Sequence, residues 1–159
     1  MSNFVAADAD RFVETGEYLR FTEFLDNCRR YRYIGVCVGA PGVGKTISAR
    51  HYSQWDLLEP LFPRYAYSKK PPAKVAECRS VFYTPPVSNS PSAIGGEIER
   101  RHNLVSWLVD AARGTRQRGK AAMGETDYTE LLIVDEANRL KVTGLEQLRD
   151  MYDLSLIHI

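Results

Sequence analysis

A glycine-rich stretch in the first third of the chain most constrains the fold. It matches the pattern G-x-x-x-x-G-K-T and directly follows the apolar run 33–38. The match comprises Gly39, Ala40, Pro41, Gly42, Val43, Gly44, Lys45 and Thr46. Residues 45–56 can continue as a helix, and a strand, a loop and a helix in this order are the context that the pattern requires. The sequence therefore predicts a phosphate-binding loop after a buried strand.

The residue types of this loop suit a polyphosphate ligand. Glycines let the backbone curl until several N–H groups converge, and the following helix N-terminus adds partial positive charge there. We expect Lys45 to reach the β- and γ-phosphates, and the Thr46 hydroxyl to bind Mg²⁺. A nucleotide with bound Mg²⁺ is thus the predicted ligand.

A second signal is the apolar run 131–134, which leads directly into Asp135 and Glu136. Four apolar residues followed by two acids are typical of a buried parallel strand that ends at a site. Asp135 is placed to hold Mg²⁺ through its water shell, and Glu136 to take the proton from a water that attacks the γ-phosphate. Lys45 and Glu136 are the predicted catalytic residues, and Thr46 and Asp135 the predicted metal ligands.

Composition indicates one folded domain. The chain has 159 residues, of which 44% are hydrophobic and 26% charged, and its net charge of +1 gives no general attraction to nucleic acid. Its three cysteines are spaced too irregularly for a zinc site or a disulfide framework. No apolar run reaches the ~18–20 residues of a membrane span, and the N-terminus lacks the pattern of a signal peptide. We expect a cytoplasmic protein without a membrane partner.

Hydrophobic periodicity predicts alternating helices and strands. The expected elements are a helix at 21–31 with Thr22 as its candidate cap, strand 33–38, helix 45–56, an irregular insertion or hairpin around 60–72, strand 80–84, a helix from Ser90 to Gly114, strand 131–134 and a helix at 144–153. Gly95 and Gly96 weaken the first turn after Ser90, which could move that helix start toward Glu97. This order implies an α/β fold with a parallel sheet covered on both faces.

Three stretches together resemble one family. GAPGVGKT, LLIVDEANRL and GLEQLRDMYD look like the AAA-type ATPases of DNA transposition, the MuB-, TniB- and TnsC-like proteins, over residues 15–153. The resemblance implies an incomplete P-loop NTPase fold of the AAA+/RecA-like type, with ATP bound by the loop and hydrolysed. It also implies binding of double-stranded DNA as a homo-oligomer, target-site selection and stimulation of a transposase. Asn138 stands where such proteins often carry glutamine, and the sequence assigns it no role.

Two other functions remain open. The first is a different AAA-type ATPase, such as a replication initiator or helicase loader. The second is a nucleotide-gated switch or scaffold that holds ATP and scarcely hydrolyses it. The strand 131–134 with its two following acids is called the acid-tipped strand below. A basic cluster before this strand is the candidate DNA contact, although a solvated loop explains the same charges. The cluster comprises Arg113, Arg116, Arg118 and Lys120.

The chain divides into three expected parts. Residues 1–32 precede the core, residues 33–153 form a partial AAA-type core, and residues 154–159 are an expected non-native tail. The tail reads LSLIHI, which a transposon-end sequencing adapter also encodes, and the alternative is a genuine terminal strand.

The resemblance implies a further strand between the loop strand and the acid-tipped strand. Without it we expect weak nucleotide binding and slow turnover.

Overall fold

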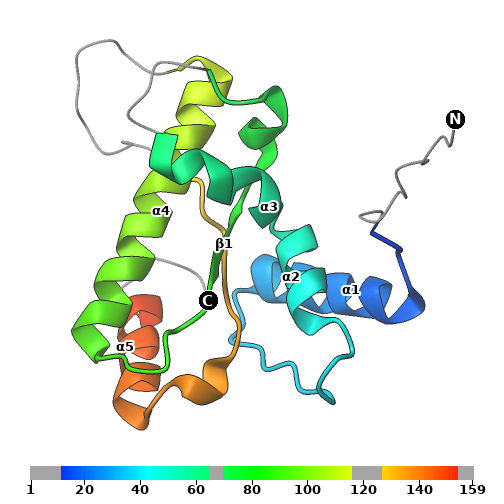
Figure 1. Ribbon diagram of the computed structural model, residues 1–159, viewed down its shortest axis with the longest axis vertical. Helices are drawn as coiled ribbons and strands as arrows, with labels where there is room; N and C mark the ends of the chain where they lie inside the picture. The colour runs from blue at the N-terminus through cyan, green and yellow to red at the C-terminus, as the bar shows by residue number, and fades with distance from the viewer. Residues whose placement is uncertain (1–11, 65–69, 116–126, 154–159) are drawn as a thin grey trace, which may run out of the picture.

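A two-stranded parallel sheet forms the centre of the computed structural model, which describes residues 12–64, 70–115 and 127–153 (Figure 1). Strand β1 (Ser80–Tyr83) pairs in parallel with β2 (Leu131–Val134), with Ser80 opposite Leu131 and Tyr83 opposite Val134. Every residue of β1 is buried. Both predicted strands are confirmed, and the long segment between them is the helical connection that parallel strands require.

Helix α4 (Pro91–Arg113) makes this connection. Ser90 caps it, because the Ser90 hydroxyl accepts a hydrogen bond of 3.3 Å from the Ala93 N–H. The helix begins at Pro91, so the expectation of a start near Glu97 was wrong. The cap and the complete burial of Ile94 in the first turn outweigh the helix propensity lost at two glycines.

Helices cover the sheet on both sides, as predicted. Figure 1 shows α4 and α5 (Val142–Asp153) on one side of the strands, and α1 (Gly16–Tyr31) and α2 (Lys45–Tyr52) on the other. Helix α5 packs closely on α4, since a Cβ atom added at Gly144 would lie 2.9 Å from the Ile94 Cδ1 atom. The observed order of elements agrees with an incomplete α/β P-loop fold.

Helix α1 begins five residues earlier than the sequence suggested. Thr15 caps it by accepting a 3.2 Å hydrogen bond from the Tyr18 N–H. The expected cap, Thr22, lies inside the helix instead, and its buried hydroxyl has no hydrogen-bond partner within the described ranges. The earlier start lets Tyr18 join Leu25 and Cys28 on the buried face of α1.

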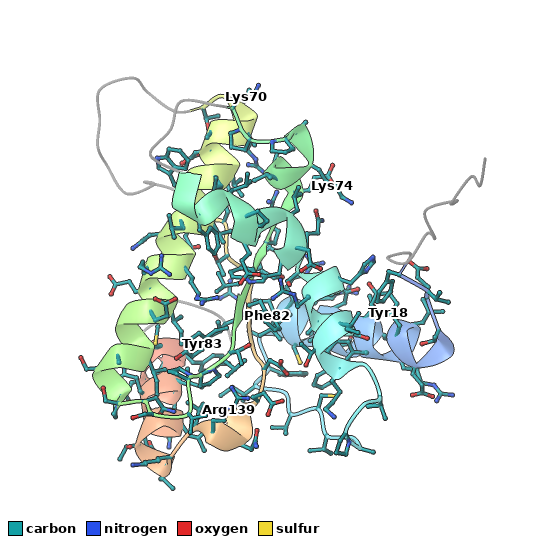
Figure 2. The ribbon with its side chains drawn as sticks, viewed as in Figure 1. Tyr18, Lys70, Lys74, Phe82, Tyr83 and Arg139 are labelled. Atoms are coloured by element: carbon teal, nitrogen blue, oxygen red, sulfur yellow. The ribbon has the colours of Figure 1, made fainter. Side chains whose placement is uncertain are left out.

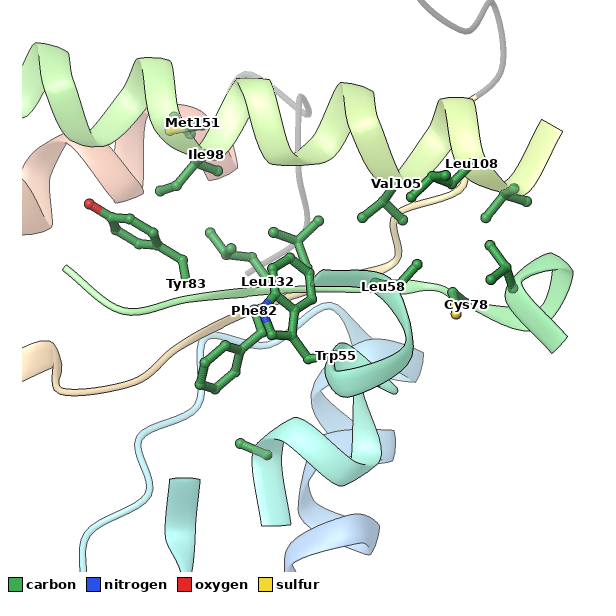
Figure 3. Close-up of a cluster of buried hydrophobic side chains, with 14 of the residues drawn as sticks. Trp55, Leu58, Cys78, Phe82, Tyr83, Ile98, Val105, Leu108, Leu132 and Met151 are labelled. Atoms are coloured by element: carbon green, nitrogen blue, oxygen red, sulfur yellow. The ribbon is translucent and has the colours of Figure 1, made fainter. Parts of the chain in front are cut away.

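The helix expected at 45–56 is broken in two. Helix α2 ends at Tyr52, Gln54 takes a left-handed backbone conformation with φ 53°, and the short α3 (Trp55–Leu58) follows. This turn places Trp55, which has no solvent exposure, in the hydrophobic core (Figure 3). Burial of a tryptophan side chain supplies the free energy that the left-handed residue costs.

The segment around residues 60–72 forms irregular structure. The 3₁₀ helix η1 (Glu59–Arg64) covers its start, the 3₁₀ helix η2 (Ala73–Glu77) follows directly after it, and the described part holds no hairpin. Residues 65–69, like 1–11, 116–126 and the tail 154–159, lie outside the described residues. The described part is therefore irregular rather than a hairpin, and whether it is an insertion stays a prediction.

One predicted strand is absent. Residues 33–38 form no strand, and their apolar side chains are exposed, Val36 to 79% and Val38 to 87%. A strand needs a neighbouring strand to pair its backbone groups, and in the described ranges β1 and β2 pair only with each other. The expectation of a buried strand before the loop was therefore wrong for this structure. The loop is instead held from its other end, by α2 and by contact with the residues after β2.

Candidate nucleotide-binding site

Two glycines shape the predicted phosphate-binding loop. Gly42 and Gly44 have φ angles of 80° and 88°, in the left-handed region that only glycine enters at little cost. Gly44 is also the N-cap of α2, so that Lys45 and Thr46 open the helix. The loop therefore delivers backbone N–H groups and a helix N-terminus to one place, which is the arrangement that binds a phosphate group.

The Lys45 ammonium group lies at this loop. Its Nζ atom donates hydrogen bonds to the carbonyl oxygens of Gly39, at 2.7 Å, and Ala40, at 2.9 Å. These bonds hold the positive charge beside the curled backbone. Phosphate oxygens are stronger acceptors than carbonyl oxygens, so a bound triphosphate would take over these bonds without moving the lysine backbone.

Thr46 and Asp135 meet across the site, although 89 residues separate them in sequence. The Thr46 hydroxyl donates to Asp135 Oδ2 at 2.9 Å. The Asp135 backbone is fixed as well, because its N–H donates to the Tyr83 carbonyl at 2.9 Å and so extends the pairing of β1 with β2. The structure thus brings together the two side chains predicted as metal ligands.

This pair of oxygen ligands fits Mg²⁺. Magnesium is usually held by one or two protein oxygens, with the substrate phosphates and water filling its other positions. The described residues contain no group of three or more His, Cys, Asp or Glu side chains that could form a complete protein site for a metal. Thr46 and Asp135 could therefore hold the cation only together with a nucleotide.

Glu136 follows Asp135 directly and has an unusual backbone conformation. Its backbone is left-handed, with φ 52° and ψ 40°, a conformation that costs a non-glycine residue about 1–2 kcal/mol. Glu136 is exposed and precedes the 3₁₀ helix η3 (Ala137–Arg139). Backbone strain of this kind is often found at functional sites.

Asn138 is the site residue that sequence reasoning missed. When its amide nitrogen is oriented toward the two available acceptors, it donates to Glu136 Oε2 and to the Glu136 carbonyl oxygen, both at 3.2 Å. The only sequence signal was its spacing of two residues from Glu136. With the left-handed backbone of Glu136, this spacing brings the Asn138 amide back to the Glu136 carboxylate.

The predicted DNA contacts are not brought together by the described residues. Arg116, Arg118 and Lys120 lie outside them. Arg113 is exposed, yet its guanidinium donates to the Ala76 carbonyl at 3.3 and 3.2 Å and stacks over the Tyr128 ring at 4.6 Å. Arg113 therefore holds the end of α4 against η2, and contact with DNA remains a prediction.

The three cysteines are free thiols, as expected. Cys28 and Cys78 are buried and Cys37 is exposed. Burial raises the pKa of the Cys28 thiol, and it raises the pKa of the Cys78 thiol to about 11. Both buried thiols thus stay protonated at neutral pH and serve as packing groups.

A cavity of about 390 Å³ lies elsewhere, beside the C-terminal half of α2. Tyr18 and His51 line it and are joined by a 2.8 Å hydrogen bond between the Tyr18 hydroxyl and His51 Nδ1. Figure 2 shows Tyr18 on the α1 side of the molecule. None of the residues lining this cavity belongs to the phosphate-binding loop or to the acid-tipped strand, so the cavity is separate from the nucleotide site.

The left-handed glycines, the loop lysine and the Thr46–Asp135 contact define a P-loop nucleoside triphosphate-binding protein. Residues 28–159 match the family model described as AAA domain, and the chain belongs to this family. No solved structure matches the chain.

A curated relative extends this comparison. The chain is 38% identical over 151 residues to a Staphylococcus aureus protein named "Potential ATP-binding protein", and the match covers 89% of this chain. The chain spans about half, 54%, of the length of that relative.

The helices among the described residues are all too short or too polar to cross a membrane.

Proposed function

We propose that this AAA-type protein hydrolyses ATP with Mg²⁺ at the site formed by the phosphate-binding loop and the end of β2. The observation that carries the proposal is the 2.9 Å contact between the Thr46 hydroxyl and Asp135 Oδ2. It brings both predicted metal ligands to one point, beside the loop that would hold the phosphates. The name of the Staphylococcus aureus relative is consistent with the ATP-binding part of this proposal.

Each side chain has a distinct task in this reaction. The loop N–H groups and Lys45 bind the β- and γ-phosphates, while Thr46 and Asp135 hold the cation. When bound, Mg²⁺ neutralises charge on the phosphate oxygens. Glu136 accepts a proton from a water molecule as that water's oxygen forms a bond to the γ-phosphorus, and the bond from the γ-phosphorus to the bridging oxygen breaks. The products are ADP and phosphate.

Phosphate release from ATP, measured with and without Mg²⁺, tests this proposal. We expect turnover that needs Mg²⁺ and that is lost in both Lys45→Ala and Glu136→Gln. A release rate that Lys45→Ala leaves unchanged would refute the site assignment, because contaminating ATPases would then account for the activity.

For the biological role, we propose ATP-dependent action on double-stranded DNA in transposition, as a homo-oligomer in the cytoplasm that selects target sites and stimulates a transposase. The support is the resemblance of the loop, the acid-tipped strand and the helix at 144–153 to transposition ATPases. Filter binding of duplex DNA tests it. We expect binding that needs ATP and weakens steeply with salt, whereas equal DNA affinity with and without ATP would contradict it. ATP-dependent stimulation of helicase loading would point instead to a replication role.

A nucleotide-gated switch with little turnover is a second candidate function. It is favoured by the exposure of residues 33–38, because a loop that follows an unpaired segment is less rigidly held than one that follows a sheet strand. The two candidates differ in a single measurement. Tight ATP binding with less than one turnover per hour, in the presence of DNA, would favour the switch.

A further inference from the structure

In the turn after β2, the Asn138 side chain contacts two groups of Glu136, its carboxylate and its backbone carbonyl. With its amide oriented so that the nitrogen faces the two acceptors, Asn138 donates to Glu136 Oε2 and to the Glu136 carbonyl oxygen, each at 3.2 Å. One amide group therefore fixes both the carboxylate and the backbone of the preceding acid. A carboxylate on an exposed turn would otherwise rotate freely about its side-chain bonds.

The turn that carries Asn138 is itself anchored. Arg139, the next residue, donates from Nη1 to the Pro85 carbonyl at 3.2 Å, and its own carbonyl accepts a 3.2 Å hydrogen bond from Asn89. Figure 2 labels Arg139 on the turn after β2, and Leu140 beyond it is buried. The strand end before the turn is held as well, because the Asp135 N–H donates to the Tyr83 carbonyl at 2.9 Å. The backbone that carries Asn138 is therefore anchored on both sides.

The left-handed backbone of Glu136 changes the direction of its side chain. Glu136 has a φ of 52°, so its side chain leaves the chain in a direction that ordinary helical or extended backbone would not give. The Asn138 amide then selects one orientation of this carboxylate. Asn138 can do this without adding charge, since an amide is neutral and donates through its nitrogen.

We propose that Asn138 is a positioning residue for ATP hydrolysis, which orients the Glu136 carboxylate for proton transfer from the attacking water. The proposal rests on the proposed function of the site. A base that is misplaced by about 1 Å can slow a reaction by roughly 100-fold, so the geometry of one hydrogen bond can control the rate. Asn138 itself touches neither nucleotide nor water in this role.

The test compares Asn138→Ala with wild type in two backgrounds, with measurement of kcat and of the Kd for a fluorescent ATP analogue. In the wild-type background we expect kcat to fall roughly 10- to 100-fold, with the Kd changed less than about twofold. In the Glu136→Gln background Asn138→Ala should cause no further loss, because its effect passes through Glu136. A structural role would lower the activity in both backgrounds.

Two further variants sharpen the result. Asn138→Asp keeps the shape and replaces the donor with a carboxylate that repels Glu136, so we expect a larger loss of kcat than in Asn138→Ala. Asn89→Ala removes an anchor of the same turn and leaves the Asn138 amide in place, so it should cost less than Asn138→Ala. Equal losses in Asn89→Ala and Asn138→Ala would assign the effect to the turn as a whole and overturn the proposal.

The outcomes separate this inference from the function on which it rests. Wild-type turnover with an unchanged or raised kcat in Asn138→Ala overturns the positioning role alone. A wild-type protein that binds the ATP analogue and shows no turnover with Mg²⁺ and DNA overturns the hydrolysis proposal, and the positioning role with it.

Discussion

The hydroxyl of Thr46 lies 2.9 Å from Asp135 Oδ2, and this hydrogen bond joins the first turn of α2 to the end of β2. The two residues belong to segments that have no local connection, since 89 positions separate them. Their contact therefore depends on how α2 and the sheet pack together. It turns two separate sequence motifs into one candidate site for a nucleotide and its cation.

Removal of the loop lysine should weaken nucleotide binding. In Lys45→Ala we expect the affinity for ATP to fall by at least about 10-fold, because charge-assisted hydrogen bonds to phosphate contribute about 1.5–3 kcal/mol. Titration with a fluorescent ATP analogue measures this. Lys141→Ala is the matched control, since it removes the same charge from an exposed lysine outside the loop. Equal affinities in Lys45→Ala and Lys141→Ala would disprove the loop assignment.

Removal of the predicted base should separate binding from turnover. We expect Glu136→Gln to bind ATP with an affinity within roughly twofold of wild type and to hydrolyse it about 10²- to 10⁴-fold more slowly, the usual contribution of general base catalysis. Single-turnover phosphate release gives the rate directly. A normal rate in Glu136→Gln would move the base to another residue.

The metal ligands can be tested through the dependence of binding on Mg²⁺. Thr46→Ala should lose roughly 10-fold of the ATP affinity that Mg²⁺ adds, equivalent to about 1.4 kcal/mol, while its affinity in EDTA stays at the wild-type value. Thr46→Ser keeps the hydroxyl and is expected to behave as wild type. If Thr46→Ala and Thr46→Ser respond to Mg²⁺ alike, the hydroxyl is not a ligand.

Two glycines provide a matched test of helix packing. A Cβ at Gly144 would lie 2.9 Å from Ile94 Cδ1, whereas a Cβ at Gly96 would meet no atom within 4 Å. Ile94 has no solvent exposure, so its Cδ1 atom has no open space to move into. Gly144→Ala should therefore lower the free energy of unfolding by about 1–3 kcal/mol through overpacking. Gly96→Ala, inside α4, should raise it by about 0.5–1 kcal/mol. Urea unfolding measures both, and a stabilised Gly144→Ala would contradict the close approach of α5 to α4.

The stability of the fold should depend on pH through Glu97. Its hydrogen bond with Arg100, aided by Arg101, lowers the pKa of the Glu97 carboxyl below its ordinary value of 4.5. A depressed pKa in the folded state stabilises the protein above the unfolded value, and this stabilisation is lost as pH falls through the folded value.

The prediction is a fall in the urea midpoint below about pH 4.5 that is smaller in Glu97→Gln than in wild type. The comparison isolates this carboxyl, because all other acids titrate in both proteins. Parallel curves for the two proteins between pH 7 and pH 3 would rule out a contribution from Glu97.

Patterns local in sequence predicted much of the fold correctly. The strands at 80–83 and 131–134 appeared where continuous apolar runs predicted them, and the Ser90 cap fixed the start of α4. Each of these depends on neighbouring residues, either through burial of a short apolar run or through a hydrogen bond within one turn. The phosphate-binding loop is local in the same sense, because its shape follows from two glycines.

Other features depended on contacts that no local pattern contains. The apolar run 33–38 has the composition of a strand, yet it remains exposed because it lacks a neighbouring strand among the described residues. The break after α2 exists because Trp55 reaches the core from a short separate helix. In both cases tertiary packing overrides a reasonable propensity.

The sequence by itself determined which residue types could bind a triphosphate and its cation, since the glycines, the lysine, the hydroxyl and the two acids are fixed by their motifs. Only the tertiary structure decided that Thr46 and Asp135 touch, and that Asn138 faces the carboxylate of Glu136. The physical reason is that the chemistry of a side chain is a property of one residue. Its distance from another side chain depends on how helices pack on the sheet and on the direction of one left-handed turn.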